Sequence, residues 1–217
     1  MEFQVFDLGL ISFKEAWDFQ KGKLNAVKSG FLKSALILCR HKPVITLGRL
    51  ARKKNILASP EILKQKGIEL YEIDRGGDVT YHGPGQVTIY PVFNLHYFKK
   101  DIHLFLRKLE EVVIDFLSDF GIEGLRYAGR TGVWIGKEKI SSIGISLKNW
   151  ITLHGVTINI KKDDLDNFQL IRPCDMDIQM TSLETVLGRD INIDGLKESI
   201  VTKFKVNFLE ECICPQK

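Results

Sequence analysis

The sequence predicts an α/β (α+β) fold, with a mixed, largely antiparallel sheet and helices packed on it. Segments with the apolar character of strands and segments with helical spacing of apolar residues both occur, but they do not alternate regularly. A doubly wound parallel sheet needs that alternation, so we expect most strands to be antiparallel. The 217 residues contain no internal repeat and no Pro/Ser-rich linker, which favours one domain over residues 1–217.

In the N-terminal half, an apolar strand is expected at residues 2–10, with a helix directly after it. Ser12 and Glu15 have the spacing of a capping box, which starts a helix, and Gly30 follows the expected end of that helix. Further strands are predicted where apolar segments lie between turn residues, at 34–39, 44–47, 68–74 and 86–93.

Two more helices are predicted from their starts and their spacing. Ser59 followed by Pro60 places an N-cap before a proline at the first helical position. The longest helix is predicted at 102–120, where apolar residues recur every three or four positions and Gly121 follows as a C-cap. A glycine-rich β region and short elements complete the chain: strands at 132–135, 139–147 and 152–160, a loop at 163–177, and helices at 183–187 and 196–208.

Composition and charge exclude several classes of protein. With 44% hydrophobic and 27% charged residues, the chain is globular rather than disordered or fibrous. Its net charge of +4 is too small to indicate nucleic-acid binding, but it suits an acidic protein partner. No apolar run approaches the ~18–20 residues that span a membrane, and the N-terminus lacks the pattern of a signal peptide. We therefore expect a cytoplasmic protein with no membrane association.

The four cysteines do not form a disulfide framework, which agrees with a reducing compartment. Cys39 lies two positions before His41, and Cys212 two positions before Cys214, and neither pair has the spacing of a structural zinc site. We therefore expect no bound metal. Considered alone, Cys174 would be an inert small residue of the core.

The most unusual segment is residues 75–86, with the sequence RGGDVTYHGPGQ. Its glycines leave a bare backbone that can approach a ligand closely, while the arginine, threonine, tyrosine, histidine and glutamine supply polar groups. Loops between strands commonly carry binding residues. The segment matches neither the dinucleotide motif nor the P-loop, and a long, well-bonded β-turn is the alternative interpretation.

Residues 75–86 resemble the signature of the lipoyl(octanoyl) transferase family, R-G-G-x-x-T-[aromatic]-H-x-x-G-Q, at all eight specified positions. Further segments are similar to other motifs of that family: 41–49, 132–144, 154–155 and 173–182. The resemblance extends from about residue 41 to residue 184. It implies the fold of the catalytic domain of biotin and lipoate protein ligases.

The resemblance also implies an activity: transfer of an octanoyl group, with lipoyl as a further candidate, from octanoyl-acyl carrier protein to a lysine ε-amine of lipoyl domains. In this family a cysteine holds the acyl group as a thioester beside a lysine, and the matching residues are Cys174 and Lys139. Transfer from thioester to thiol changes the free energy little, and transfer to an amine is downhill, so neither ATP nor another cofactor is expected. As an ammonium, Lys139 would lower the pKa of the thiol from its usual ~8.5; as a neutral amine, it would take the thiol proton.

Partners and substrate-binding residues follow from the same resemblance. The expected partners are octanoyl-acyl carrier protein and the lipoyl domains of 2-oxoacid dehydrogenase complexes and of the glycine cleavage H protein, bound by a monomeric enzyme. The residues expected to bind substrate lie in three motif segments: Arg75, Gly76, Gly77, Asp78, Val79, Thr80, Tyr81, His82, Ser142, Ile143, Gly144, Gly155, Val156 and Thr157.

Physical requirements of the reaction suggest roles within that set. His82 and the backbone N–H groups of the glycine loop are candidates for stabilising the oxyanion. The acyl chain needs a narrow apolar tunnel, expected to be floored by the glycine-bearing strands, at about 0.8 kcal/mol per buried CH2. The apolar stripe of helix 102–120 is expected to be core, and His41 and His154 to support the structure rather than contact substrate.

Several alternatives remain open at this stage. Lys139 alone would be a surface lysine of a hairpin, and Lys137, two positions earlier on the same expected strand face, could take its place. Asp175 follows Cys174 where the family has glycine, and its carboxylate would raise the pKa of the thiol. Other functions also fit: an ATP-dependent lipoate–protein ligase on the same fold, or an inactive paralogue that binds acyl carriers.

Overall fold

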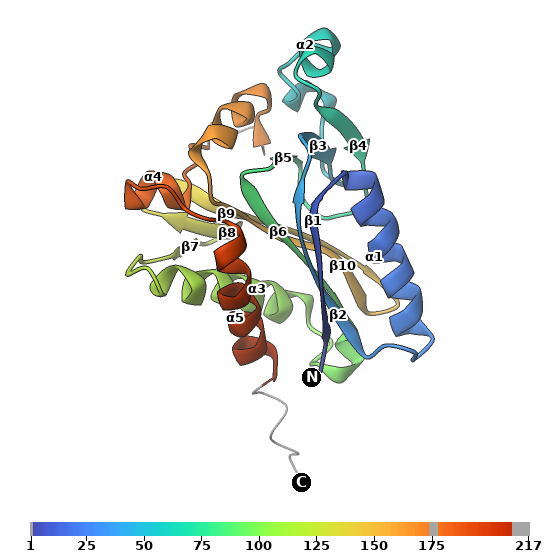
Figure 1. Cartoon of the computed structure of the whole chain (residues 1–217). Coiled ribbons are helices and arrows are strands. Elements are labelled where there is room, and N and C mark those ends of the chain that lie inside the picture. Colours follow the sequence, from blue (N-terminus) through green and yellow to red (C-terminus); the bar gives the residue numbers. More distant parts are fainter. Residues whose placement is uncertain (1, 174–177, 210–217) are drawn as a thin grey trace.

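The computed structural model describes residues 2–173 and 178–209, and its largest element is a seven-stranded sheet (Figure 1). Its strands, in the order of neighbours, are β1 (Gln4–Ile11), β2 (Ser34–His41), β6 (Gln86–Phe93), β10 (Ile151–Asn159), β9 (Glu138–Lys148), β8 (Arg130–Ile135) and β7 (Leu125–Tyr127). Strands β1 and β2 pair in parallel, and every other pair of neighbours in this sheet is antiparallel. The predicted mixed, largely antiparallel sheet is confirmed.

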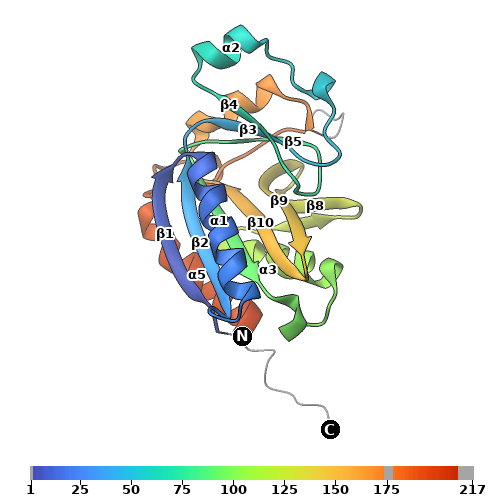
Figure 2. The same cartoon turned by 90° about the vertical axis from the view of Figure 1, so that its right-hand side faces the viewer.

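A second sheet of three strands lies beyond one end of the large sheet, at the top of Figures 1 and 2. Its order is β4 (Glu69–Glu72), β3 (Val44–Leu47) and β5 (Val79–His82). The sequence predicted strands at 68–74 and 86–93 and none between them, so β5 was missed. There Val79 and Tyr81 pack in the same apolar cluster as Ile45 and Leu47 of β3, so burial makes this segment a strand.

Helices cover both faces of the large sheet (Figure 2). Helix α1 (Phe13–Lys28) packs on one face, and α3 (Ile102–Ser118) packs with α5 (Lys197–Leu209) on the other. Strand β2 alternates between them, because Ala35 and Ile37 join the α1 cluster while Leu36 and Leu38 join the α3 cluster. This burial on two faces explains why β2 is apolar along its length.

Local sequence signals set most helix ends. The predicted capping box is confirmed: Ser12 Oγ accepts the N–H of Glu15, and Ser12 N–H donates to Glu15 Oε2 at 3.2 Å. Helix α3 ends at Ser118 with Asp119 as its C-cap, so the predicted end at residue 120 and the predicted cap at Gly121 are wrong. Gly121 instead takes a φ of +69° in the turn that follows.

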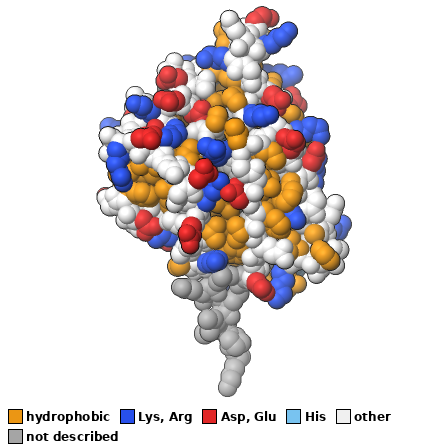
Figure 3. All heavy atoms as spheres, viewed as in Figure 1, with side chains coloured by type: hydrophobic (Ala, Val, Ile, Leu, Met, Phe, Trp, Pro, Cys, Tyr) orange, Lys and Arg blue, Asp and Glu red, His pale blue; other side chains and the backbone are white. Residues whose placement is uncertain are grey.

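The remaining described elements are short. They are the helices α2 (Pro60–Gln65) and α4 (Leu183–Leu187), and the 3-10 turns η1 (Lys53–Asn55), η2 (Leu95–Tyr97), η3 (Lys162–Leu170) and η5 (Asp194–Leu196). Residues 162–170, expected mostly within a loop, are therefore a 3-10 segment. In the part of the chain that the structure describes, no helix is both long and apolar enough to span a membrane. Figure 3 shows one face, where exposed hydrophobic side chains lie among charges of both signs.

Candidate active site

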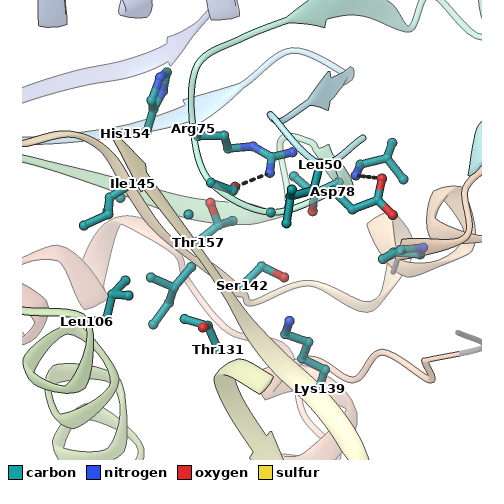
Figure 4. A pocket seen from close by; sticks show the side chains of 18 of the residues that line it. Leu50, Arg75, Asp78, Leu106, Thr131, Lys139, Ser142, Ile145, His154 and Thr157 are labelled. Atoms are coloured by element: carbon teal, nitrogen blue, oxygen red, sulfur yellow. Dashed lines mark hydrogen bonds between the residues drawn. The ribbon is translucent and has the colours of Figure 1, made fainter. Parts of the chain in front are cut away.

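A cavity of about 490 Å³ lies between the small sheet and strands β8–β10 of the large sheet. The segment from Arg75 to His82 forms one wall, the three strands form a second, and Ile102 and Leu106 of α3 form a third. Figure 4 shows side chains from these walls around the same space, with Leu106 entering from α3. The walls come from distant parts of the chain, so the fold assembles the cavity.

The cavity brings together most of the residues that the family resemblance suggested. The predicted residues that line it are Lys139, Arg75, Gly76, Gly77, Asp78, Val79, Thr80, His82, Ser142, Ile143, Gly144, Gly155 and Thr157. Cys174 lies outside the described residues. Pro173 and Ile178, the described residues on either side of residues 174–177, both line the cavity.

Tyr81 and Val156 do not line it. Tyr81 belongs to the core of the small sheet, where its Oη donates to Asp164 Oδ1 (3.3 Å) and its ring packs on Phe168. Val156 belongs to the core under α3. Both side chains lie on the core side of their strands, because side chains alternate between the two faces of a strand.

Arg75 organises the loop around it rather than extending into solvent. Its side chain is buried, and Nη2 donates to the carbonyl oxygen of Thr46 at 2.7 Å while Nε donates to Thr46 Oγ1 at 3.2 Å. Nη1 also donates to the carbonyl oxygen of Gly76 at 3.0 Å. Several directional bonds from one guanidinium hold residues 75–76 against β3.

Glycines let the 75–77 backbone approach both sheets. A Cβ on Gly48 would lie 2.4 Å from the carbonyl oxygen of Gly77, and one on Gly144 would lie 3.0 Å from that of Gly76. The Gly76 N–H donates to the Ile145 carbonyl of β9 at 2.8 Å. The loop therefore packs backbone against backbone between the sheets, which any larger residue at Gly48 would prevent.

Lys139 extends into the cavity from the start of β9, with its amine toward Ser142 in Figure 4. Its Nζ lies 4.9 Å from the centre of the Trp134 ring, in cation–π contact. The Lys139 N–H donates to the Gln179 carbonyl at 2.9 Å, and its own carbonyl accepts the Thr181 N–H at 3.0 Å. Lys139 is thus paired with the chain that follows residues 174–177.

Lys137 is not on the same strand face as Lys139, and the expectation that it was is wrong. It lies in the turn before β9, which begins at Glu138, and its side chain is exposed. It does not line the cavity. Between the two lysines, the geometry favours Lys139.

Two histidines lie buried behind the loop in the neutral form. Burial lowers the pKa of His82 well below its ordinary value, and His82 Nδ1 is 3.3 Å from Thr157 Oγ1. Burial also lowers the pKa of His41 to about 4, and His41 Nε2 is 2.6 Å from Tyr90 Oη. A neutral imidazole can donate one hydrogen bond, so His82 can serve a developing negative charge without carrying its own.

His154 lines the cavity, although the sequence suggested a supporting role for it. Its Nε2 is 2.9 Å from Asp74 Oδ1, and this bond holds the pKa of Asp74 below its usual range. Burial nonetheless lowers the pKa of His154, so the pair at neutral pH is a carboxylate with a neutral imidazole. His154 has a φ of +59°, an uncommon backbone conformation for a residue with a side chain.

Comparison with known proteins places the chain in a family. A family model described as lipoyl protein ligase A/B catalytic domain matches residues 12–205. An octanoyltransferase of Koribacter versatilis is 41% identical over 97% of this chain and 86% of its own length. An octanoyltransferase of Thermoanaerobacter sp. is 42% identical over 94% and 90% respectively. The chain belongs to the lipoyl(octanoyl) transferase family. It is therefore an acyltransferase.

Solved structures agree on the fold. A lipoate-protein ligase A with bound ATP superposes with a TM-score of 0.75 at 17% identity, covering 96% of this chain and 86% of that one. A bipartite lipoate protein ligase of Thermoplasma acidophilum gives 0.72 at 16% identity, covering 96% and 84%. A biotin protein ligase of Aquifex aeolicus gives 0.57 at 13% identity, covering 95% and 71%. The predicted biotin/lipoate ligase fold is confirmed.

The stripe on helix 102–120 was expected to be core. Ile102 and Leu106 do pack against the core, but they also line the cavity, which was not expected. The spacing of apolar residues is the same whether a helix faces a filled core or an empty pocket, so the sequence carries no signal for the difference. Phe13 and Tyr90, also in the lining, were missed for the same reason.

No group of three or more histidine, cysteine, aspartate or glutamate residues suitable for a metal occurs within residues 2–173 and 178–209. Cys39 Sγ lies 3.4 Å from His41 Nε2, but the thiol is fully buried, and burial raises its pKa. Cys212 and Cys214 lie outside the described residues. The Cys39–His41 pair is thus a core contact.

Proposed function

We propose that this acyltransferase moves an octanoyl group through a thioester on Cys174. In the first step, the Cys174 thiolate attacks the thioester carbonyl of octanoyl-acyl carrier protein. A new C–S bond forms, and the carrier sulfur leaves with a proton from the Lys139 ammonium. In the second step, a lipoyl-domain lysine attacks the same carbon, the amide forms, and Cys174 leaves as a thiolate. Before it attacks, the lysine ammonium gives one proton to neutral Lys139, and the amine loses its second proton to solvent as the amide forms.

The observation that supports this assignment is the arrangement of the cavity around one lysine. Lys139 extends into it, and the described residues on either side of the 174–177 segment, Pro173 and Ile178, line the same space. Residues 179 and 181 hydrogen-bond to the backbone of Lys139. The described residues on either side of that segment therefore line a cavity that contains a candidate proton carrier.

Oxyanion stabilisation falls to His82 in this proposal. The N–H of Gly76 is already donated to Ile145, so it does not serve the oxyanion. His82 lines the cavity, is neutral, and has two ring nitrogens of which one faces Thr157. Its ring also has a hydrogen bond to the Gln86 side chain, so in this proposal the ring releases one of these two partners and donates toward the carbonyl oxygen of a bound thioester.

The acyl chain would extend toward α3. Ile102, Leu106, Ile143 and Ile145 supply apolar surface there, and all four line the cavity. Burying the methylene groups of an octanoyl chain contributes about 0.8 kcal/mol for each CH2. The cavity thereby combines an apolar end with a polar end formed by Lys139, as a fatty thioester requires.

Acyl carrier protein and lipoyl-domain lysines are the substrates that the family implies. As the proteins that accept the octanoyl group, we propose the lipoyl domains of 2-oxoacid dehydrogenase complexes and of the glycine cleavage H protein. We further propose that the chain acts in the cytoplasm as a monomer with one catalytic domain. We propose octanoyl as the transferred group, with lipoyl as an alternative acyl group that the enzyme would also transfer.

Intact-mass spectrometry after incubation with octanoyl-acyl carrier protein tests the mechanism. The wild-type chain should gain the mass of one octanoyl group without ATP, and the gain should disappear in Cys174→Ala. Cys39→Ala is the matched control, because Cys39 is buried in the core and should leave the adduct intact. An ATP requirement would favour a ligase, and the absence of any adduct would favour a protein that only binds acyl carriers.

A further inference from the structure

Glu110 of α3 is a buried carboxylate that reaches the strand beside Lys139. Its side chain is 1% exposed. Oε2 accepts from Arg107 Nη1 at 2.6 Å and from Arg126 Nε at 3.1 Å, while Oε1 accepts the backbone N–H of Gly132 at 3.1 Å. The two arginines compensate the buried charge, and the third bond joins α3 to β8 at one backbone position.

Because Gly132 has no side chain, the end of the Lys139 side chain can occupy the space beside it. A Cβ at this position would lie 2.6 Å from Lys139 Cε and 3.2 Å from Lys139 Nζ. It would also lie 2.5 Å from the Ser141 carbonyl oxygen, and Gly132 has a φ of +133°, which L side chains rarely adopt. The end of the lysine side chain is therefore packed against bare backbone of β8, between Gly132 and the Trp134 ring.

We propose that Glu110 is a positioning residue, which holds Lys139 in its cavity-facing conformation by fixing the backbone of Gly132. The inference rests on the role proposed above for Lys139. The carboxylate does not line the cavity, so it acts through Gly132 rather than on substrate. When the Gly132 backbone is fixed, it restricts the Lys139 side chain to the conformation that extends into the cavity. When that backbone can move, the amine can move away from the thioester.

Other ionisable side chains of the cavity could also influence the reactivity of the Cys174 thiol. The titratable side chains that line the same cavity are Arg75, Asp78, His82, Tyr90, Arg130 and His154. Glu110 bonds instead to Arg107, Arg126 and the Gly132 N–H. A change at Glu110 should therefore reach the reaction through the position of Lys139.

The test measures the thiolate of Cys174 in the full chain. Iodoacetamide alkylation of the Cys174 peptide, followed by mass spectrometry over a pH series, gives the apparent pKa of that thiol. Lys139→Ala should raise it toward the ordinary value of about 8.5. Glu110→Ala should shift it in the same direction, and Glu110→Gln should shift it less, because the amide oxygen still accepts the Gly132 N–H. In both Glu110 variants kcat should fall while the KM for octanoyl-acyl carrier protein stays near wild type.

Glu184→Gln is the matched control. Glu184 is also a buried carboxylate, and it accepts from Lys161 Nζ and from the backbone N–H groups of Lys162 and Ile191. None of these partners lines the cavity, so its alkylation profile should match wild type.

The possible results separate the two proposals. If Lys139→Ala shifts the profile and folded Glu110→Gln and Glu110→Ala do not, the positioning role is wrong and the Cys–Lys mechanism survives. If Glu110→Ala fails to fold, Glu110→Gln alone decides. If Lys139→Ala itself leaves the profile unchanged, both proposals fall. A shift in Glu184→Gln as large as that in the Glu110 variants would reduce the effect to general loosening, and would also overturn the inference.

Discussion

The two walls of the cavity are built in opposite ways. On the side of the small sheet, the wall is backbone packed on backbone, with the carbonyls of Gly76 and Gly77 against Gly144 and Gly48. On the β8–β9 side, the wall is made of side chains, with Lys139 lying over Trp134 in the space beside Gly132. The first wall places backbone near a substrate, and the second places a group that can carry a proton.

The difference shows how each wall tolerates change. Backbone contacts cannot relax without moving a loop, whereas a lysine side chain can change its conformation, and so misplace its amine, while the fold around it stays intact. Substitutions in the backbone wall should therefore damage both stability and activity. Substitutions around the lysine should mainly affect the rate.

The largest effect is expected for Gly48→Ala. The new methyl group would lie 2.4 Å from the Gly77 carbonyl oxygen and 3.0 Å from that of Arg75. Moving the loop away should cost about 1–3 kcal/mol of unfolding free energy and lower kcat/KM by about 100-fold. Chemical denaturation and steady-state assays measure the two effects. Gly22→Ala is the control, since nothing lies within 4 Å of its Cβ position on α1, and it should stabilise slightly. Wild-type activity in Gly48→Ala would show that the backbone wall is not rigid.

Arg75→Lys should have the next largest effect. Lysine can replace the charge, but not the bonds that Nε and Nη2 donate to Thr46 at 3.2 and 2.7 Å. Loss of buried hydrogen bonds should lower the unfolding free energy by about 1–3 kcal/mol. Activity should fall in parallel, because the 75–77 loop loses its anchor to β3. Thermal denaturation and activity, measured on the same samples, test this. Equal stability with lost activity would mean that Arg75 contacts substrate instead.

A pH effect of intermediate size is expected at the junction of the two sheets. The folded-state pKa of His41 is about 4, below the unfolded value of about 6.5, so folding keeps this ring neutral. Its contribution to stability is complete above pH 6.5 and is lost as the pH falls from there toward 4. His82 and His154 act with the same sign, since their pKa values are also lowered.

Urea denaturation at a series of pH values measures this loss. Within the window from pH 6.5 to 4, His41→Gln should reduce the slope of unfolding free energy against pH by up to about 1.4 kcal/mol per pH unit. The Nε2 contact to Tyr90 is also changed, so the comparison uses slopes rather than absolute stabilities. An identical slope in the variant would mean that His41 binds its proton equally well in the folded and unfolded chain, so that folding does not lower its pKa.

The smallest effects are expected at two exposed arginines near the cavity. Arg130 begins β8 and lines the cavity, and Arg49 precedes Leu50, which lines it on the side of the small sheet. If an acidic carrier protein docks across the opening, Arg49→Ala and Arg130→Ala should each raise its KM a few-fold, and salt should raise it further. Octanoyl-pantetheine, a small neutral donor, should be insensitive to both changes. A response at one arginine alone would place the carrier on one side of the opening.

Much of the fold and part of the site could be predicted from the sequence. The strands and helices of the large sheet follow from apolar spacing and from local signals such as the Ser12–Glu15 cap. The loop at 75–86 was visible because its glycines and polar residues are adjacent in the chain. The cavity roles of Ile102 and Leu106 were not visible, because apolar spacing does not distinguish a pocket from a core. Strand β5 was missed because it is only four residues long and lies among glycines and polar residues, so its pairing with β3 leaves little local signal.

The sequence by itself determined the family, the class of fold and the motif that surrounds the site, since these depend on residues close together in the chain. Tertiary structure decided which side chains face the cavity, why Lys139 rather than Lys137 enters it, and how Glu110 reaches Gly132 across 22 residues. These relations depend on strand register and on helix packing. Register turns each side chain to one face or the other, and packing brings distant segments within hydrogen-bond distance.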